Sequence, residues 1–596
     1  MKFSEMPLAS EQSSGLRARL VLAGACLFLV FTAFEIKTPV VSLGSVGFTS
    51  SEVAAGIFIV LSLIYGAGER AWYFSRRALD LPVLLFVLVN FLSTALAAED
   101  KPTAFKFSLR MMYAGLVYLA VSRLPGKSRA HLFMAGTVAA TLIVVTMIGL
   151  AENYITFIYW PDVLEPFHEG IITFGTFYNV RVASTLPFPT LLSMYLELAL
   201  PIALVFGLWL RDRPGSRRRW LEMGMVVLMG AVMVVQTYTF TRSALVAIPA
   251  SMIGGAALAA VYGYGRRVWI LLLTGVGLLA AVVILSLLFS NKVASRLDVA
   301  EQENHYGAEY TAISIPTDLA LDQVATARMH IKNTGTINWA PEGGDEVGLS
   351  YRWLTYPDKE IRQDIEFLVT PMPHVIHPGE EADFDVDFRA PDRDGKYVLV
   401  FDLAKAHVGW FSSAGVAPLT LPLEFTGGSS KPFVVSEPRD NFEAREPDFI
   451  TSTRSQLWRA GILAWKANPI LGLGPDQFRK HYFDYMPELQ HDEKVRTHNI
   501  LLEAAATTGI VGLAVMVFLL VQTVWLQFQL VRKRDWNTSF RLVSLALAMA
   551  TIAYLFHGVL DYFLGQTGIV FLFFSYLGMT AWLKKSTDER SVESAE

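Results

Sequence analysis

The chain has 596 residues, of which 53% are hydrophobic and only 17% are charged, and its mean hydropathy is +0.39. Soluble domains carry about 25% charged residues, and here the apolar residues gather in runs long enough to cross a bilayer. This composition excludes a soluble cytoplasmic enzyme. The formal net charge of −4 gives no reason to expect a nucleic-acid partner. Cys26, the single cysteine, excludes an intramolecular disulfide and a cysteine-rich metal site.

Twelve apolar runs predict an α-helical integral membrane protein with about twelve transmembrane helices. The second run is interrupted by Ser50, Ser51 and Glu52. The predicted spans are residues 18–35, 41–66, 81–98, 108–123, 130–150, 187–210, 221–239, 243–263, 268–290, 499–530, 541–560 and 566–583.

Basic residues occupy alternate connections between these spans. Lys and Arg gather near residues 17–19, 70–77, 123–129, 211–219, 266–267, 532–534 and 584–585, and the intervening short loops nearly lack them. Cytoplasmic loops of membrane proteins carry such an excess of basic residues. The pattern predicts a multi-pass protein of the cytoplasmic (inner) membrane with both termini in the cytoplasm. Adding or removing one span would place several basic loops on the wrong side.

Two of the predicted external segments are long. Residues 151–186 are rich in aromatic side chains, which suit a re-entrant or interfacial stretch at the level of the lipid headgroups. Residues 291–498 are numerous enough to form a domain of their own.

Residues 308–426, within the second external segment, have the pattern of a β-sheet protein. Apolar and polar side chains alternate in the runs Ala325–Ile331, Glu346–Trp353, Ala382–Phe388 and Lys396–Leu403, and Gly- and Pro-containing turns separate them. Short alternating strands at this spacing predict an extracytoplasmic all-β insertion folded as a β-sandwich.

Aromatic and turn motifs in this segment support a more specific comparison. The stretch Lys332–Trp339, with Tyr351-Arg-Trp353, Gly395-Lys-Tyr397 and Trp410-Phe411, resembles a bacterial immunoglobulin-like module. We expect Trp339, Trp353 and Trp410 to form the core of the sandwich. The alternative is that they stack against a glycan.

The predicted organisation has four parts. Residues 1–290 contain transmembrane helices one to nine, and residues 308–426 form the β-sandwich. Residues 440–498 form an extracytoplasmic helical loop that carries active-site residues. Residues 499–596 contain transmembrane helices ten to twelve and a cytoplasmic tail.

The candidate catalytic residues gather on the outer face. They lie in five features, which are Arg181 before Ala183-Ser-Thr-Leu-Pro187, Thr241-Arg-Ser243, Arg454-Ser-Gln-Leu-Trp-Arg-Ala460, Asn468-Pro-Ile-Leu-Gly-Leu-Gly-Pro475 and Thr497-His-Asn-Ile-Leu-Leu-Glu503. The third is amphipathic at helical spacing. The glycines of the fourth allow a turn to approach a ligand or a neighbouring backbone closely.

Each feature also has a simpler interpretation. An arginine at the end of a span often reaches lipid phosphate, a glycine-rich turn is common, and His498 could begin a helix without taking part in chemistry. Glu197, His557 and Asp561 lie inside or beside spans, where a polar group is costly unless it is paired or faces water. We interpret these three as helix-packing contacts.

Taken together, the motifs are more specific than any one of them. Arg181, Arg242-Ser243, Arg454 with Trp458, Asn468–Gly474 and His498-Asn-x-x-Leu-Glu503 resemble the signature of the O-antigen ligase and polymerase superfamily. The resemblance extends over the membrane part from about residue 170 to 530. The inserted β-sandwich is a departure, because it separates Arg242 from His498 by more chain than the basic ligase pattern has.

The resemblance implies transfer of a glycan from a polyprenyl (undecaprenyl) diphosphate donor to an acceptor hydroxyl. Guanidinium groups hold a diphosphate by two-point contacts and stay protonated, so we assign Arg181, Arg242 and Arg454 to the donor. Histidine titrates in a useful range for proton transfer, so we assign His498 to the hydroxyl. The outer loops beside these arginines contain no Asp-x-Asp motif, and we expect a metal-independent enzyme without cofactor. Inversion at the sugar is implied by the resemblance alone.

Several functions share these features. The acceptor could be a glycolipid, as in O-antigen ligation, a growing polysaccharide, as in repeat-unit polymerisation, or a protein, as in O-oligosaccharyl transfer. A polysaccharide or lipid transporter could also have twelve spans, but it should show repeat symmetry between halves, and the arrangement of nine and three spans is asymmetric. A surface receptor that binds through the β-sandwich would not require arginines and a histidine at several span ends. The expected partners are the lipid-linked glycan donor, the acceptor and membrane lipid.

Overall fold

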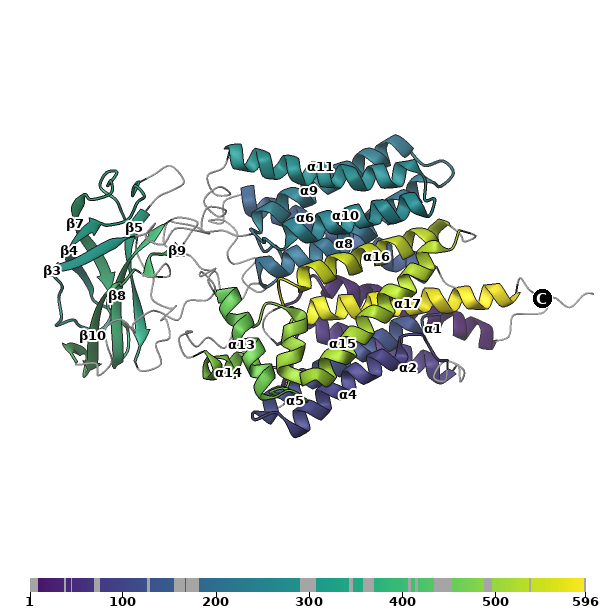
Figure 1. Ribbon diagram of the computed structural model, residues 1–596, viewed down its shortest axis with the longest axis horizontal. Helices are drawn as coiled ribbons and strands as arrows, with labels where there is room; N and C mark the ends of the chain where they lie inside the picture. The colour runs from purple at the N-terminus through teal and green to yellow at the C-terminus, as the bar shows by residue number, and fades with distance from the viewer. Residues whose placement is uncertain are drawn as a thin grey trace, which may run out of the picture.

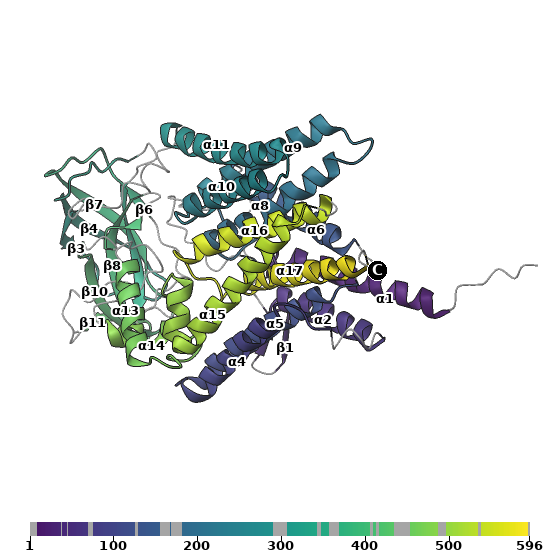
Figure 2. The same cartoon turned by 45° about the vertical axis from the view of Figure 1, so that its right-hand side comes forward.

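A computed structural model of the chain describes residues 9–36, 39–43, 46–68, 75–125, 129–154, 167, 182–289, 307–341, 347–356, 369–405, 409–412, 416–433, 453–486, 496–534 and 538–593. Apolar helices form one bundle, and the strands between residues 308 and 432 form a separate unit beyond one end of it (Figure 1). In both Figure 1 and Figure 2 this β-unit lies at the end of the bundle where helices α13 (Thr453–Ala467) and α14 (Phe478–Tyr485) are found.

The bundle helices follow the predicted spans. They are α1 (Ala9–Phe31), α2 (Ser50–Gly68), α4 (Asp80–Leu96), α5 (Lys101–Ser122), α6 (Ala130–Tyr154), α8 (Pro189–Arg211), α9 (Arg218–Tyr238), α10 (Ala244–Val261), α11 (Arg266–Phe289), α15 (Ile500–Arg532), α16 (Thr538–Gly558) and α17 (Thr567–Glu593). Within the described residues, ten helices are long and apolar enough to cross a membrane, and α4 is apolar but shorter. The chain is therefore a helical, multi-pass membrane protein, and the count of twelve spans stays a prediction.

The second predicted span begins too early. Strands β1 (Val41–Leu43) and β2 (Val46–Phe48) pair antiparallel, and α2 begins only at Ser50. The reason is a capping box. The Thr49 N–H donates to Glu52 Oε2 at 2.9 Å, and the Glu52 N–H donates to Thr49 Oγ1 at 3.4 Å. The polar residues that interrupt the apolar run therefore mark the start of the helix.

Burial separates the central helices from the peripheral ones. α8, α16 and α17 are largely buried inside the bundle, whereas most of α11 faces outward. α16 packs against both α8 and α10, and α17 packs against α5. A polar side chain on α8 or α16 is consequently enclosed by protein rather than lipid, where it needs a polar partner.

α15 is broken near its first third. Its 33 residues would extend about 50 Å as a straight helix, which exceeds the hydrocarbon core of about 30 Å. The break is at Gly509, whose φ is 66°. A Cβ there would lie 2.2 Å from the backbone of Ile470, so only glycine fits. The Ile510 N–H donates to Pro469 O at 2.8 Å and satisfies a backbone group at the break.

The β-unit contains two antiparallel sheets. One has the order β11-β10-β8-β5-β6, with β9 paired to β8, and the other has the order β3-β4-β7. The strands are β3 (Ala308–Ser314), β4 (Val324–Asn333), β5 (Val347–Thr355), β6 (Val369–Pro371), β7 (Glu381–Arg389), β8 (Gly395–Lys405), β9 (Gly409–Trp410), β10 (Leu419–Thr426) and β11 (Ser429–Pro432). Side chains from both sheets meet in one hydrophobic cluster.

The four predicted alternating runs correspond to β4, β5, β7 and β8. Trp339, Trp353 and Trp410 are buried, with 0%, 1% and 5% of their surface exposed. These values favour the interpretation as core residues over glycan stacking. The larger sheet continues beyond residue 426, because β11 pairs with β10.

Candidate active site

His498 lies in a constrained turn just before α15. Its φ is 49°, a left-handed conformation that is uncommon for a residue other than glycine. The turn is fixed on both sides. The Thr497 N–H donates to Glu503 Oε2 at 3.0 Å, and Asn499 Oδ1 caps α15 by accepting from the Leu501 and Leu502 N–H groups. Backbone strain of this kind gathers at functional sites.

Asp561 is the partner of His498. The Nδ1 atom of His498 lies 3.0 Å from Asp561 Oδ1, and the His498 side chain is 25% exposed while that of Asp561 is 10% exposed. The Tyr562 N–H also donates to Asp561 Oδ1, at 2.8 Å. Asn499 Nδ2 donates to Val559 O at 3.0 Å and joins the same two segments. The carboxylate therefore orients the imidazole of a histidine that remains partly accessible.

The polar contacts continue from Asp561 into the bundle. His557, one helical turn before Asp561, has its Nε2 atom 3.9 Å from Asp561 Oδ2 and 2.9 Å from Ser243 Oγ. Its Nδ1 atom lies 2.8 Å from Glu197 Oε2. The His557 and Glu197 side chains are only 1% and 0% exposed. Four residues, from α8, the start of α10, and the end of α16 with the loop after it, thus share one buried network.

The network ends at the next helix. Ser193 Oγ donates to Glu197 Oε1 at 3.1 Å, and Gln236 Nε2 of α9 donates to Ser193 Oγ. These contacts satisfy the second oxygen of a carboxyl group that is otherwise enclosed by apolar helices, as a buried polar group requires.

Arg242 lies in the turn between α9 and α10. Phe240 in this turn has a φ of 50°, and Thr239 Oγ1 donates to Gln236 O at 2.7 Å. The Arg242 side chain is exposed, whereas its neighbour Ser243 is buried and contacts His557. The structure therefore connects Arg242 to His498 through Ser243, His557 and Asp561.

The structure describes the other two predicted arginines, Arg181 and Arg454, less fully. Arg181 lies outside the described residues, but the N–H of Val182, which follows it, donates to Tyr238 O at 3.0 Å at the end of α9. Arg454 lies on α13, and its side chain is outside the part of the chain that the structure describes.

The glycine-rich turn lies against the break in α15. Gly472 has a φ of 69°, and a Cβ there would lie 2.4 Å from the backbone of Thr507, so the two backbones are in direct contact. Asp476, just after the turn, pairs with Arg496 at 2.6 Å. Since Arg496 is two residues before His498, this ion pair fixes the His498 turn to the glycine-rich segment.

A second ion pair anchors the same segment to the bundle. Lys480 Nζ of α14 lies 2.6 Å from Asp100 Oδ2, at the start of α5. Hydrogen bonds from Lys480 and Thr103 hold the pKa of the Asp100 carboxyl well below its usual range. The scaffold around His498 is thus attached at both its α14 and α15 ends.

The structure adds to the interpretation of three polar residues. Glu197, His557 and Asp561 join helices, as expected of helix-packing contacts, and they also form one network with His498 and Ser243. The sequence contained one signal for this, the i, i+4 spacing of His557 and Asp561 at the end of an apolar run. Arg496 was also missed, because an arginine near a span end looks like many others.

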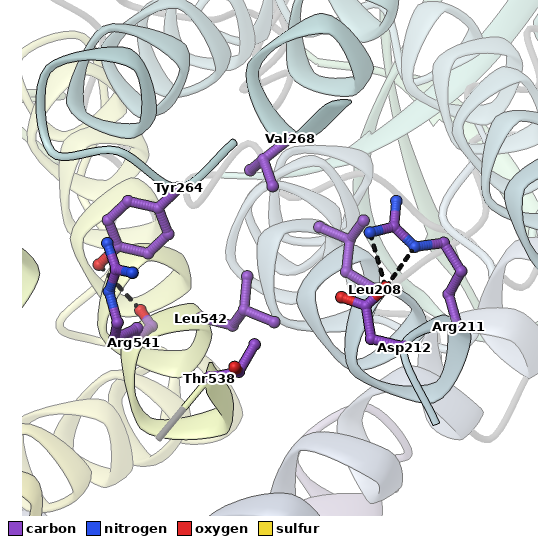
Figure 3. Close-up of a pocket in the computed structure, with 8 residues that line it drawn as sticks. All are labelled: Leu208, Arg211, Asp212, Tyr264, Val268, Thr538, Arg541 and Leu542. Carbon is purple, nitrogen blue, oxygen red and sulfur yellow. Dashed lines mark hydrogen bonds and ion pairs between the residues drawn. The ribbon is translucent and has the colours of Figure 1, made fainter. Parts of the chain in front are cut away.

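A pocket lies away from this network, at the other end of α8. Leu208, Arg211, Asp212, Tyr264, Val268, Thr538, Arg541 and Leu542 line it (Figure 3). Leu208 is 11 residues after Glu197, or about 16 Å along the helix. Among the described residues, no group of three or more His, Cys, Asp or Glu is arranged to hold a metal ion.

Comparison with known proteins gives one match. The family model described as O-antigen ligase matches residues 403–517, which include Arg454, the glycine-rich turn, His498 and the first part of α15. A comparison with curated proteins finds no match. The match covers less than half of the chain, and it supports the resemblance to the O-antigen ligase superfamily, whose members are glycosyltransferase-like enzymes.

Proposed function

We propose that this protein transfers a glycan from a polyprenyl diphosphate to an acceptor hydroxyl. The observation that carries this proposal is the contact between His498 Nδ1 and Asp561 Oδ1, 3.0 Å long, at a partly exposed turn within the matched family region. A carboxylate on Nδ1 fixes the imidazole tautomer so that Nε2 accepts a proton, and it stabilises the imidazolium that results.

In the proposed reaction, the acceptor hydroxyl gives its proton to His498 Nε2 as its oxygen attacks the anomeric carbon. The bond between that carbon and the diphosphate oxygen breaks, and the polyprenyl diphosphate leaves with the bonding electrons. The acceptor gains the glycan and the configuration at the anomeric carbon inverts. A positioned general base contributes typically about 10²–10⁴-fold to such a rate.

The proposed role of Arg181, Arg242 and Arg454 is to hold the diphosphate. Negative charge grows on this leaving group in the transition state, and preorganised cations stabilise developing charge far better than water does. The exposed Arg242 side chain beside the buried Ser243 contact suits this role. No metal ion or cofactor is required by the proposal, so a chelator should leave transfer unchanged.

The proposed orientation places the His498 end of the bundle and the β-unit outside the cytoplasm, with both termini inside. We further propose that the β-unit is immunoglobulin-like, since its two antiparallel sheets share one core. Single cysteines introduced at Gly215 and Thr326, in a Cys26→Ala background, test this orientation. An impermeant thiol reagent on intact cells should label position 326 and not 215, and the reverse labelling would contradict it.

The test of the proposed function is release of polyprenyl diphosphate. The purified full-length protein in nanodiscs is supplied with a polyprenyl-diphosphate-linked glycan and candidate acceptors, and both products are quantified. The proposal predicts equal amounts of transferred glycan and free polyprenyl diphosphate. A transporter would move the donor between leaflets of a vesicle without cleaving it, and that result would contradict the proposal.

A further inference from the structure

We propose that Ser243, His557 and Glu197 form a positioning unit, which holds the His498–Asp561 pair and the Arg242 turn in a fixed spatial relation. The unit would make the proposed base and one proposed donor-binding arginine act together. This inference rests on the proposed function and assigns to it residues that do not touch the substrate.

The three residues have the contact pattern of a Ser-His-acid triad. His557 Nε2 lies 2.9 Å from Ser243 Oγ, and His557 Nδ1 lies 2.8 Å from Glu197 Oε2. In hydrolases this pattern activates the serine as a nucleophile. Here Ser243, His557 and Glu197 are all buried. A glycan could not reach Ser243 Oγ, so burial argues against a nucleophile.

The unit instead has two connections to the candidate site. On one side, Ser243 is covalently next to Arg242 and begins the first turn of α10. On the other side, His557 Nε2 faces Asp561 Oδ2 at 3.9 Å, and Asp561 Oδ1 contacts His498 Nδ1 at 3.0 Å. A shift of the His557 ring would therefore change both the carboxylate that orients His498 and the hydroxyl beside Arg242.

Glu197 determines the orientation of that ring. Both carboxylate oxygens lie within 3.0 Å of His557 Nδ1, and Ser193 donates to Oε1. Nδ1 is therefore the nitrogen that faces α8, and Nε2 is directed toward Ser243 and Asp561. A buried ionisable group is costly in a membrane bundle, and replacing a buried ion pair by apolar residues is often neutral or stabilising. A role in positioning gives a reason for this polar unit that stability alone does not.

A double-mutant cycle separates positioning from mere structural support. Glu197→Gln, Asp561→Asn and the double variant are assayed as full-length protein in nanodiscs, with turnover and donor KM measured separately. Glu197→Gln should lower kcat by about 10- to 100-fold, the range for a hydrogen bond to a charged group. In kcat, the double variant should be no slower than Asp561→Asn alone, because the effect of Glu197 on the proposed base passes through His557 to Asp561. The effect of Glu197 through Ser243 on the Arg242 turn should appear in the donor KM instead. Multiplicative losses would overturn the inference, since independent sites combine additively in free energy.

Asp80→Asn is the matched control. Asp80 pairs with Arg123 at 2.7 Å and accepts from Tyr118 OH at 2.9 Å, and neither of these partners belongs to the network around His498. Its loss should lower thermal stability while kcat per folded molecule stays within twofold, and its effect should multiply with that of Asp561→Asn. If Asp80→Asn instead shows the same dependence on Asp561 as Glu197→Gln, the inference is overturned.

Ser243→Ala is a second variant that tests the positioning unit if Glu197→Gln does not fold. It leaves the His557–Glu197 pair intact and should raise the donor KM several-fold through the Arg242 turn, with a smaller change in kcat. An unchanged donor KM would overturn the part of the inference that concerns Arg242.

The failure of the proposed function and the failure of the positioning unit give different results. Full transfer by His498→Ala would remove the proposed base, whereas an inactive His498→Ala beside a fully active Glu197→Gln would remove only the positioning unit.

Discussion

The helical bundle and the β-unit each contain a buried polar network, and the network of the bundle leads to a histidine in a left-handed backbone conformation. In the β-unit, Arg352 Nη2 lies 3.4 Å from Asp402 Oδ2 and donates to Ser412 Oγ at 2.9 Å, and Tyr310 OH donates to Asp402 Oδ1 at 3.1 Å. The Arg352 guanidinium also lies 4.5 Å from the ring centre of Trp410. Arg352 and Asp402 are 2% and 0% exposed, so the centre of this network lies in the interior of the β-unit.

In the bundle, the contacts from Glu197 lead through His557 and Asp561 to His498, whose side chain is 25% exposed. The difference teaches that a buried polar cluster is not by itself a sign of chemistry. What distinguishes the bundle network is its connection to a partly exposed, conformationally strained histidine. We expect substitutions in the network of the β-unit to change stability, and substitutions in the network of the bundle to change turnover.

The largest effect on stability is expected at Asp402. Burial raises the pKa of its carboxyl, and Arg352 and Ser412 oppose that shift. Asp402→Asn leaves the Arg352 charge without its partner, which costs about 3–5 kcal/mol for a buried pair. Hydrogen exchange in the full-length protein should show faster exchange in β5 and β8, with donor turnover per folded molecule unchanged. If Asp402→Asn instead lost turnover without faster exchange in β5 and β8, the assignment of the β-unit network to stability and of the bundle network to turnover would be contradicted.

An intermediate effect is expected at Arg242. Arg242→Lys keeps the charge but loses the planar two-point contact with the diphosphate. We expect kcat/KM for the donor to fall by about 10- to 100-fold, with changes in both kcat and KM, because the contact acts in the ground and transition states. Arg213→Lys is the control. Arg213 follows the C-terminal end of α8, and its guanidinium lies over the Trp209 ring. Equal losses in both variants would contradict a specific role for Arg242.

These expectations also show what could be predicted from the sequence. Apolar periodicity and basic loops predicted the helices, because lipid imposes a strong constraint on composition. The alternation of apolar and polar side chains predicted β4, β5, β7 and β8, because one face of each strand packs in the core. The start of α2 at Ser50 was missed because a capping box counts more than the hydropathy of the residues before it.

The candidate site was only partly predictable. His498 and Arg242 could be selected from motifs, but the contact of Glu197 with His557 joins residues 360 positions apart. A single sequence contains no local pattern for such a contact, since it depends on which helices become neighbours. For the same reason, the sequence allowed Glu197, His557 and Asp561 to be interpreted as helix-packing contacts but did not show that they belong to one network.

The smallest effect is expected on the surface of the β-unit, at His330. Asp383 Oδ1 lies 2.8 Å from its Nδ1 and Glu381 Oε2 lies 3.1 Å from its Nε2, and these contacts raise the pKa of His330. A raised pKa in the folded state stabilises the fold fully below the unfolded value of about 6.5, and this contribution disappears as pH rises through the folded value. His330→Gln should therefore lower the unfolding temperature slightly at pH 5.5 and not at pH 9. A larger loss at pH 9 would contradict the assigned ion pairs.

The most direct test of the central claim measures donor binding and glycan transfer by His498→Ala in one preparation. The account predicts that transfer falls by about 10²–10⁴-fold, the usual contribution of a general base, while the Kd for the polyprenyl-diphosphate glycan stays within a few-fold because arginines hold the diphosphate. His131→Ala, which removes a buried histidine that contacts Ser539 at 3.2 Å, should transfer at nearly the wild-type rate per folded molecule. Full transfer by His498→Ala, with binding intact, would contradict the account.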